Sequence, residues 1–446
     1  MRDALLILWL ATMGADRIDL LAGSGPFVLT PFLVLTPIIL AMSAADWAIG
    51  RRRITIPRDT APFLLAATGL ASVVLVSVLF SSDLEMSAKR TALLFAQLYG
   101  SFVIALLLIN HARPESILVR GAYWGIGIAI AFNIAQVWFW VTEGATSAVW
   151  GVIDLTPQVY GTWVPRLSGA VIDQNRGGLL LLVYLFLLGR FARPSRLRSV
   201  FIFVGVLAVI TTLSRSAMLG GLATLGVFWI TGGLTRFSRL QLFGFACAAA
   251  AVAVLLIAMP HQLDVVAAYT EPLAGRFSVA EGSSRVHLGL IERGFEVSTA
   301  SIQNALIGIG FGNSFVVLEE FFPGTMYANF HSLYLTLLAE SGVFALALGL
   351  ILLLYPVARP GPFLAIIVGM AFFNLFYQST TDPAFWLMIA LAWLTAGKSG
   401  HARESRHPAS LRETTLDGAA LRAPDHTHVR GNDEFIILNR LKSCEV

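Results

Sequence analysis

Apolar runs of about 20 residues recur along most of the chain, and they restrict its fold more than any other feature. Hydrocarbon cannot satisfy exposed backbone N–H and C=O groups, so such runs form either helices or a closed barrel. Barrel strands alternate apolar and polar residues, whereas VGVLAVITTL (204–213) and ILLLY (351–355) do not alternate. We therefore predict an all-α fold, a polytopic membrane bundle of about 12 transmembrane helices.

The predicted spans rest on the length that a helix needs to cross a bilayer, which is about 17 to 25 apolar residues. They lie at 4–23, 26–47, 60–80, 91–110, 117–141, 176–190, 198–213, 216–232, 241–259, 332–357, 361–379 and 383–397. The first span is interrupted by Asp16, Arg17 and Asp19, whose spacing permits the two carboxylates to neutralise the arginine locally. Because no small-residue cleavage site precedes Asp16, we predict a retained span rather than a signal peptide.

Positive charges indicate the orientation, since Lys and Arg collect in short cytoplasmic loops. With the spans above, the basic connections fall on one side; they hold Arg51, Arg52, Arg53, Arg113, Arg120, Arg190, Arg193, Arg196, Arg198, Arg236, Arg239, Arg359 and Lys398. This places both termini in the cytoplasm and the long loops at about 142–175 and 260–331 on the opposite, extracytoplasmic face. The chain then divides into a transmembrane domain, 1–399, and a polar cytoplasmic tail, 400–446, which we expect to be mostly disordered.

Composition excludes several other classes of protein. Hydrophobic residues make up 56% of the chain and charged residues 13%, against about 25% charged residues in soluble domains. The net charge of +4 follows from basic cytoplasmic loops, so we expect no nucleic-acid partner. Cys247 and Cys444 form no disulfide framework or zinc motif, and no His or carboxylate spacing suits a metal. We therefore predict no metal and no cofactor.

Basic side chains gather in the segments assigned to the extracytoplasmic face. They are Arg166, Arg176, Arg215, Arg276, Arg285, Arg293 and His331. A guanidinium group binds phosphate through two parallel hydrogen bonds, and several such donors would offset the desolvation of a diphosphate at a membrane. A histidine where a loop meets a span suits a general base for a sugar hydroxyl, because its ordinary pKa lies near neutrality. The pattern favours a site for a lipid-linked diphosphate.

Each of these side chains also has a purely structural interpretation. Arg215 could reach the lipid headgroups from a very short loop, and His331 could cap the following helix or lie among headgroups. Asp173 and Asn175 are common N-cap residues. The GIGFGN turn (308–313) either binds phosphate through its amides or is a tight turn that needs positive φ angles.

Residues 284–300 predict a short amphipathic helix, because Val286, Leu290, Ile291 and Phe295 recur at helical spacing among charged residues. Such a helix is expected to lie along the outer membrane surface.

Four segments resemble the O-antigen ligase and polymerase superfamily of bacterial envelope glycosyltransferases. They are RLSGAVIDQNRGG (166–178), TLSRSAMLGG (212–221), SSRVHLGLIERGFEVSTASIQNALIGIGFGNSF (283–315) and NFHSLYLTLLAESGVFA (329–345). The family pattern has a loop arginine, an amphipathic helix, a Gly-x-Gly turn, a His-Asn-x-Tyr-Leu motif and Glu-x-Gly. Ser332 replaces the usual asparagine here, and Ala305 stands where proline is common. The resemblance extends to the topology, with one large periplasmic loop late in the chain.

The resemblance implies that Arg215, Arg285 and His331 bind the diphosphate donor and take part in catalysis. We further predict that the diphosphate or the glycan contacts Arg166, Asn175, Arg276, Arg293, Ser332 and Tyr334. His331 would deprotonate the acceptor, while arginines stabilise the leaving group in a single inverting displacement that needs neither metal nor nucleotide.

The implied protein is a glycosyltransferase of the Gram-negative inner membrane, in contact with membrane lipids and with other proteins of envelope polysaccharide assembly. As a ligase it would move a glycan from undecaprenyl diphosphate to a hydroxyl of lipid A core. As a polymerase it would extend another carrier-linked repeat, in O-antigen or exopolysaccharide synthesis. A transporter or flippase for lipid-linked sugar is the alternative from another class, although the late outward loop and the lack of related halves disfavour it.

Overall fold

The computed structural model describes residues 1–22, 28–50, 55–58, 60–143, 148–149, 151–160, 164–231, 282–324 and 328–396, all within one compact unit. It does not describe the side chains of residues 143, 148, 158–160, 164 and 282–285. The span predicted at 241–259 and the tail predicted at 400–446 lie outside the described residues.

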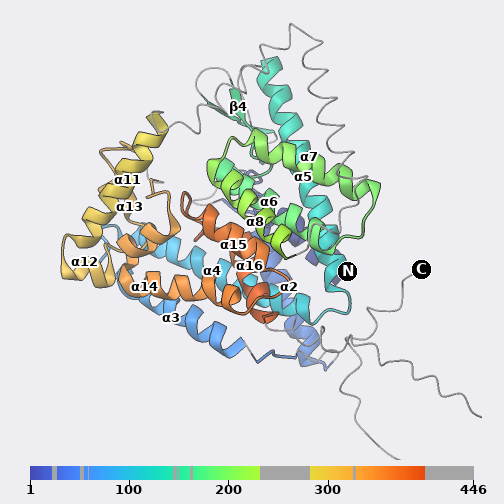
Figure 1. Cartoon of the computed structure of the whole chain (residues 1–446), viewed down its shortest axis with the longest axis horizontal. Coiled ribbons are helices and arrows are strands. Elements are labelled where there is room, and N and C mark those ends of the chain that lie inside the picture. The colour runs from blue at the N-terminus through green and yellow to red at the C-terminus, as the bar shows by residue number, and fades with distance from the viewer. Residues whose placement is uncertain are drawn as a thin grey trace, which may run out of the picture. The chain divides into compact units, whose positions relative to one another are not determined.

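The described residues are mostly helical (Figure 1). The first group of helices is α1 (Arg2–Thr12), α2 (Pro31–Ala48), α3 (Thr60–Val78), α4 (Leu84–Ile109), α5 (Pro114–Glu143), α6 (Gln174–Phe191), α7 (Arg196–Thr211) and α8 (Arg215–Ile230). The second group is α11 (Gly282–Thr299), α12 (Ile302–Ile307), α13 (Ser314–Val317), α14 (Leu333–Ala358), α15 (Leu364–Phe373) and α16 (Pro383–Leu394).

Every predicted span except the one at 241–259 overlaps one of these helices. By length and composition, five of the described helices can cross a membrane: α2, α3, α4, α5 and α14. Helices α8, α15 and α16 are apolar but shorter. The structure therefore supports an all-α membrane protein but does not confirm the predicted number of about 12 spans.

Short strands interrupt the loop predicted at 142–175. Strand β1 (Ala148–Val149) pairs antiparallel with β2 (Ile153–Asp154), and β3 (Gln158–Tyr160) pairs antiparallel with β4 (Val164–Arg166). The all-α prediction therefore omits two small hairpins.

The first predicted span is wrong, because α1 ends at Thr12 and residues 13–22 form a loop. Arg17 holds this loop in place. Its buried guanidinium donates to the carbonyl oxygens of Val171 and Thr156, both at 2.8 Å, and pairs with Asp154 at 3.5 Å. Asp16 forms its ion pair with Arg176, and its negative charge also acts on Arg17, as predicted. The contacts of Arg17 and Asp16 with residues distant in sequence hold residues 13–22 as a loop rather than as a continuation of α1.

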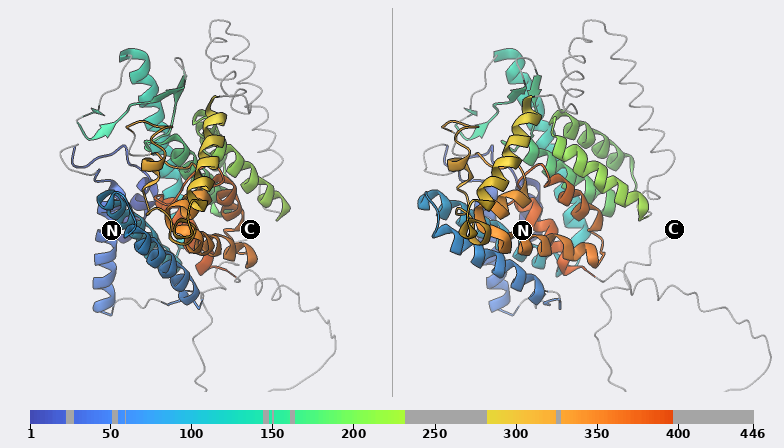
Figure 2. Two further views of the ribbon diagram at one scale, coloured as in Figure 1. Left: turned by 90° about the vertical axis from the view of Figure 1, so that its left-hand side faces the viewer. Right: turned by 60° about the vertical axis from the view of Figure 1, so that its left-hand side comes forward.

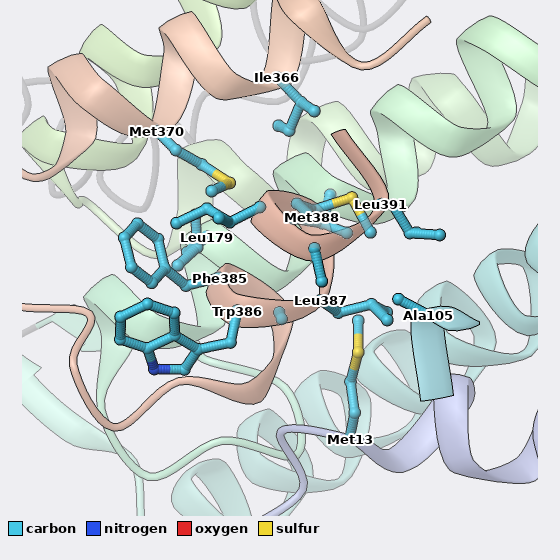
Figure 3. Close-up of a cluster of buried hydrophobic side chains, with 14 of the residues drawn as sticks. Met13, Ala105, Leu179, Ile366, Met370, Phe385, Trp386, Leu387, Met388 and Leu391 are labelled. Carbon is cyan, nitrogen blue, oxygen red and sulfur yellow. The ribbon is translucent and has the colours of Figure 1, made fainter. Parts of the chain in front are cut away.

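Helix α16 lies at the centre of the hydrophobic core. All of its residues are buried, and it packs against α3, α4, α6, α14 and α15. Figure 3 shows Phe385, Trp386, Leu387 and Met388 of this helix among apolar side chains from other elements. Twelve residues rise about 18 Å, which is less than the hydrocarbon thickness of about 30 Å. This apolar stretch is therefore a core helix that is too short to cross the hydrocarbon layer by itself.

Helices α11, α12 and α13 lie against α14 (Figures 1 and 2). The closest contact joins the end of α12 to a break inside α14, where Gly342 has φ +79°. A Cβ atom on Gly342 would collide with the carbonyl of Leu306, and one on Gly308 would collide with the backbone of Glu340. Both positions require glycine, for conformation and for space.

Substitution of Gly342 by alanine is expected to destabilise the protein by about 2–4 kcal/mol, because left-handed backbone and a backbone clash add together. Gly127→Ala in α5 is the matched control, since a Cβ atom there meets open space. Unfolding titrations in mixed detergent micelles measure both variants. Equal stability of the two variants would contradict the close contact between α12 and α14.

Candidate functional site

The N-terminal ends of α6, α8, α14 and α16 meet at one end of the bundle. Asp173 caps α6 by accepting hydrogen bonds from the amides of Asn175 (2.8 Å) and Arg176 (3.0 Å). Ser214 caps α8 and donates to Asn175 Oδ1 at 2.7 Å, which joins α8 to α6. The N-cap prediction is thus confirmed for Asp173, whereas Asn175 lies inside α6 and binds the start of α8. Partial positive charge of helix starts accumulates here.

An ion-pair network joins α6 to the start of α16. The guanidinium of Arg176 donates to Asp16 through Nη1 and to Asp382 through Nε, both at 2.5 Å. Asp382 immediately precedes α16, and its side chain is almost fully buried. The charge of Arg176 is thereby matched by carboxylates of the protein itself.

His331 lies one residue before the N-cap of α14, with its backbone in the left-handed region at φ +50°. Its amide donates to Asn329 Oδ1 at 2.8 Å, and the amide of Leu333 donates to the carbonyl of Tyr377 at 2.8 Å. The side chain that caps α14 belongs to Ser332, which accepts from the amide of Leu335. The interpretation of His331 as the helix cap is therefore wrong, and its imidazole is left for another role.

The imidazole of His331 is half-buried among aromatic rings. Its centroid lies 4.9 Å from that of His287 in α11, with the rings at 76°, and 6.4 Å from that of Phe322. Nδ1 is buried and has no hydrogen-bond partner among the described residues. Burial lowers the pKa of His331, although the negative charge of Asp173 acts in the opposite direction. A neutral imidazole is the form that accepts a proton.

The predicted arginines lie in different parts of the structure. Arg215 is the first residue of α8, half-buried beside the Ser214–Asn175 contact. Arg166 Nε donates to the carbonyl of Thr212 at 3.0 Å, so Arg166 lies at the same end of the bundle. Arg285 belongs to α11, but its side chain is not described, and Arg276 lies outside the described residues.

The remaining predicted contacts are engaged within the protein. Arg293 pairs with Glu296 at 3.1 Å and with Glu320 at 3.7 Å. The hydroxyl of Tyr334 donates to the carbonyl of Ala371 at 2.8 Å. The predicted site residues with described side chains thus form two groups. The first lies where α6 meets the start of α8 and contains Arg166, Asn175 and Arg215. The second lies at the start of α14 and contains His331 and Ser332.

The GIGFGN turn is a tight turn, as one of the two interpretations predicts. Gly308, Gly310 and Gly312 all have positive φ angles. Every amide from Gly308 to Ser314 donates to an acceptor in the protein. Phosphate binding through these amides is therefore excluded in this conformation.

Glu340 explains the Glu-x-Gly part of the motif. Its fully buried carboxylate accepts hydrogen bonds from the amides of Gly312 (2.8 Å) and Ser314 (3.1 Å), and this fixes the glycine turn on α14. A single glutamate within a long apolar run is the sequence signal that points to such a buried role.

The amphipathic helix predicted at 284–300 is present as α11. Leu290 and Val297 are buried against α14, whereas Val286 and Phe295 are exposed. The predicted apolar face is thus divided between protein packing and an exposed surface, and contact of α11 with the membrane stays a prediction. No sequence pattern predicts the ring contact of His287 with His331, because the two residues are distant in sequence.

Comparison with known proteins identifies the central part of the chain. Residues 200–350 match the family model described as O-Antigen ligase, and a search of curated proteins gives no match. The matched range contains Arg215, α11, the glycine turn, His331 and Glu340. Together with the long apolar helices, it indicates a multi-pass membrane protein. The match covers about a third of the chain, and it supports membership of the O-antigen ligase superfamily.

Proposed function

We propose that the protein transfers a glycan from a polyprenyl diphosphate carrier to an acceptor hydroxyl at the periplasmic face of the inner membrane. Family membership supports ligase or polymerase activity in the broad sense. The observation that carries the finer proposal is the environment of the His331 imidazole. The ring is half-buried where the starts of α6 and α14 converge, and burial lowers its pKa and so favours the neutral form.

In the proposed reaction, a nitrogen of His331 takes the proton of the acceptor hydroxyl. The acceptor oxygen then bonds to the anomeric carbon, and the bond between that carbon and the diphosphate oxygen breaks. The electron pair leaves with the diphosphate, so a single displacement inverts the anomeric configuration. General-base assistance of this kind typically contributes about 10²- to 10⁴-fold to the rate.

Arg215 and Arg285 are the proposed ligands of the leaving diphosphate, with Arg166 and Arg276 as further donors. Arg215 starts α8, where the helix dipole and the guanidinium charge both favour an anion. Stabilisation by fixed cations and dipoles is most effective where charge develops in the transition state. Arg293 pairs with Glu296 and Glu320, so two carboxylates of the protein already match its charge.

The acceptor distinguishes two versions of this function. A ligase uses a hydroxyl of lipid A core, and a polymerase uses a second carrier-linked glycan. Both place the site on the periplasmic face with the termini in the cytoplasm, as the distribution of Lys and Arg predicts. We favour the ligase version because the matching family model carries that description.

The test is glycan transfer by the purified full-length protein in liposomes, with an undecaprenyl-diphosphate glycan as donor and EDTA present. Lipid A core and the carrier-linked glycan are offered as separate acceptors. We expect transfer to lipid A core that the chelator does not abolish. Chain extension on the carrier would replace the ligase by the polymerase, and loss of transfer with EDTA would contradict the metal-free reaction.

A further inference from the structure

A general base works best when another group fixes its orientation. In most acid–base sites a hydrogen bond to the second ring nitrogen does this. The described residues supply no such bond to Nδ1 of His331, although this atom is buried. The orientation of the ring must therefore depend on packing.

The packing partners are aromatic and come from α11 and from the loop that follows α13. His287 stands edge to face with His331 at 4.9 Å, and Phe322 lies at 6.4 Å. Offset and edge-to-face ring pairs of this kind lie in the favourable range of separations.

The fold directs His287 toward His331. His287 lies three residues before Leu290 and seven before Gly294, so these residues share one face of α11. Leu290 is fully buried against α14, and a Cβ atom on Gly294 would overlap the side chain of Leu335. The close helix contact at Gly294 brings His287 within ring contact of the residue that precedes α14.

We propose that His287 is a positioning residue for His331, holding the imidazole by ring packing and keeping water from one of its faces. This inference rests on the proposed function of His331 as the base. Helix α11 also carries Arg285, so one helix would present a ligand for the diphosphate and fix the orientation of the base.

The groups facing His331 determine the expected pH dependence. Among the described side chains they are His287 from α11, the uncharged Phe322 and Asn329, and Asp173 at the start of α6. Burial favours the neutral imidazole and lowers the pKa of His331, while Asp173 opposes this. Removal of the His287 ring admits water, so the pKa should rise toward its ordinary value. Activity should then be lost at a higher pH than in wild type as the solution is acidified.

The experiment compares His287→Ala, His287→Phe and Leu288→Ala in the liposome transfer assay across pH. Leu288 is the neighbouring position on α11 and is 56% exposed, so it serves as the control. We expect His287→Ala to lower kcat about 10- to 100-fold with little change in KM, since small misplacements of a catalytic group have effects of this size. His287→Phe should retain kcat within a factor of about three and keep the wild-type acidic limb, because the packing persists.

Three outcomes would overturn this inference. One is wild-type kcat in His287→Ala. Another is an equal loss in His287→Phe and His287→Ala, which would assign the effect to a nitrogen atom of His287 rather than to packing. The third is an equal loss in Leu288→Ala. The His331→Asn variant separates this result from the proposed function: if that variant is inactive, the base assignment stands whatever His287 does.

Discussion

Replacement of His331 is expected to lower the rate of glycan transfer by about 10²- to 10⁴-fold, the usual contribution of a general base. Asparagine is the better substitution than alanine, because it tolerates the left-handed backbone that His331 adopts at φ +50°. His331→Asn thus removes the proton acceptor while leaving the start of α14 capped by Ser332. Initial rates of transfer in liposomes measure the effect.

The control for this variant is His111→Ala. His111 lies between α4 and α5, where its ring bonds Asp3 at 3.0 Å. Its loss should leave transfer at the wild-type rate. Normal transfer by a folded His331→Asn protein would remove His331 from the reaction and direct attention to another base.

Replacement of Arg176 by alanine is expected to destabilise the protein by about 3–5 kcal/mol, because it leaves two buried carboxylates without their cation. Asp16 and Asp382 both lie 2.5 Å from this guanidinium, and all three side chains are at most 21% exposed. The network connects the loop after α1 to α6 and α16, so helix starts next to the site should loosen together. Unfolding titrations in mixed detergent micelles give the free-energy change.

Two further variants test the reason for this loss. The triple variant Asp16→Asn, Arg176→Leu, Asp382→Asn removes all three charges and should recover much of the stability, since neutral replacement of buried ions is often tolerated. Lys89→Ala removes an exposed ion pair with Glu85 and should leave stability unchanged within error. If Arg176→Ala unfolds like Lys89→Ala, the network does not stabilise the fold.

The apolar runs predicted the helices well where a helix is both long and apolar. Helices α3 and α14 lie close to their predicted spans, whereas α4 begins at Leu84, before its predicted span at 91–110. The runs could not separate a span from a core helix, because hydropathy is similar for a side chain facing lipid and one facing protein. Helix α16 shows this: its apolar sequence reads as a span, yet all of its residues are buried.

At the site, the sequence predicted features that depend on a few neighbouring residues, but it did not predict contacts between residues distant in sequence. Asp173 as a cap and the glycine turn follow from short patterns that act within a few residues. The contact of His287 with His331 and the bond of Asp16 to Arg176 join residues distant in sequence. No spacing rule reports such contacts, so the order of the helices in space had to be known first.

The most direct test of the central claim is the stoichiometry of a single turnover. Purified protein in liposomes is mixed with a limiting amount of labelled polyprenyl-diphosphate glycan and excess acceptor, and both products are quantified by mass spectrometry. Our account predicts one glycosidic bond of inverted configuration for each polyprenyl diphosphate released, and neither product with His331→Asn. Movement of the intact donor across the bilayer without a new glycosidic bond would contradict it and favour a transporter.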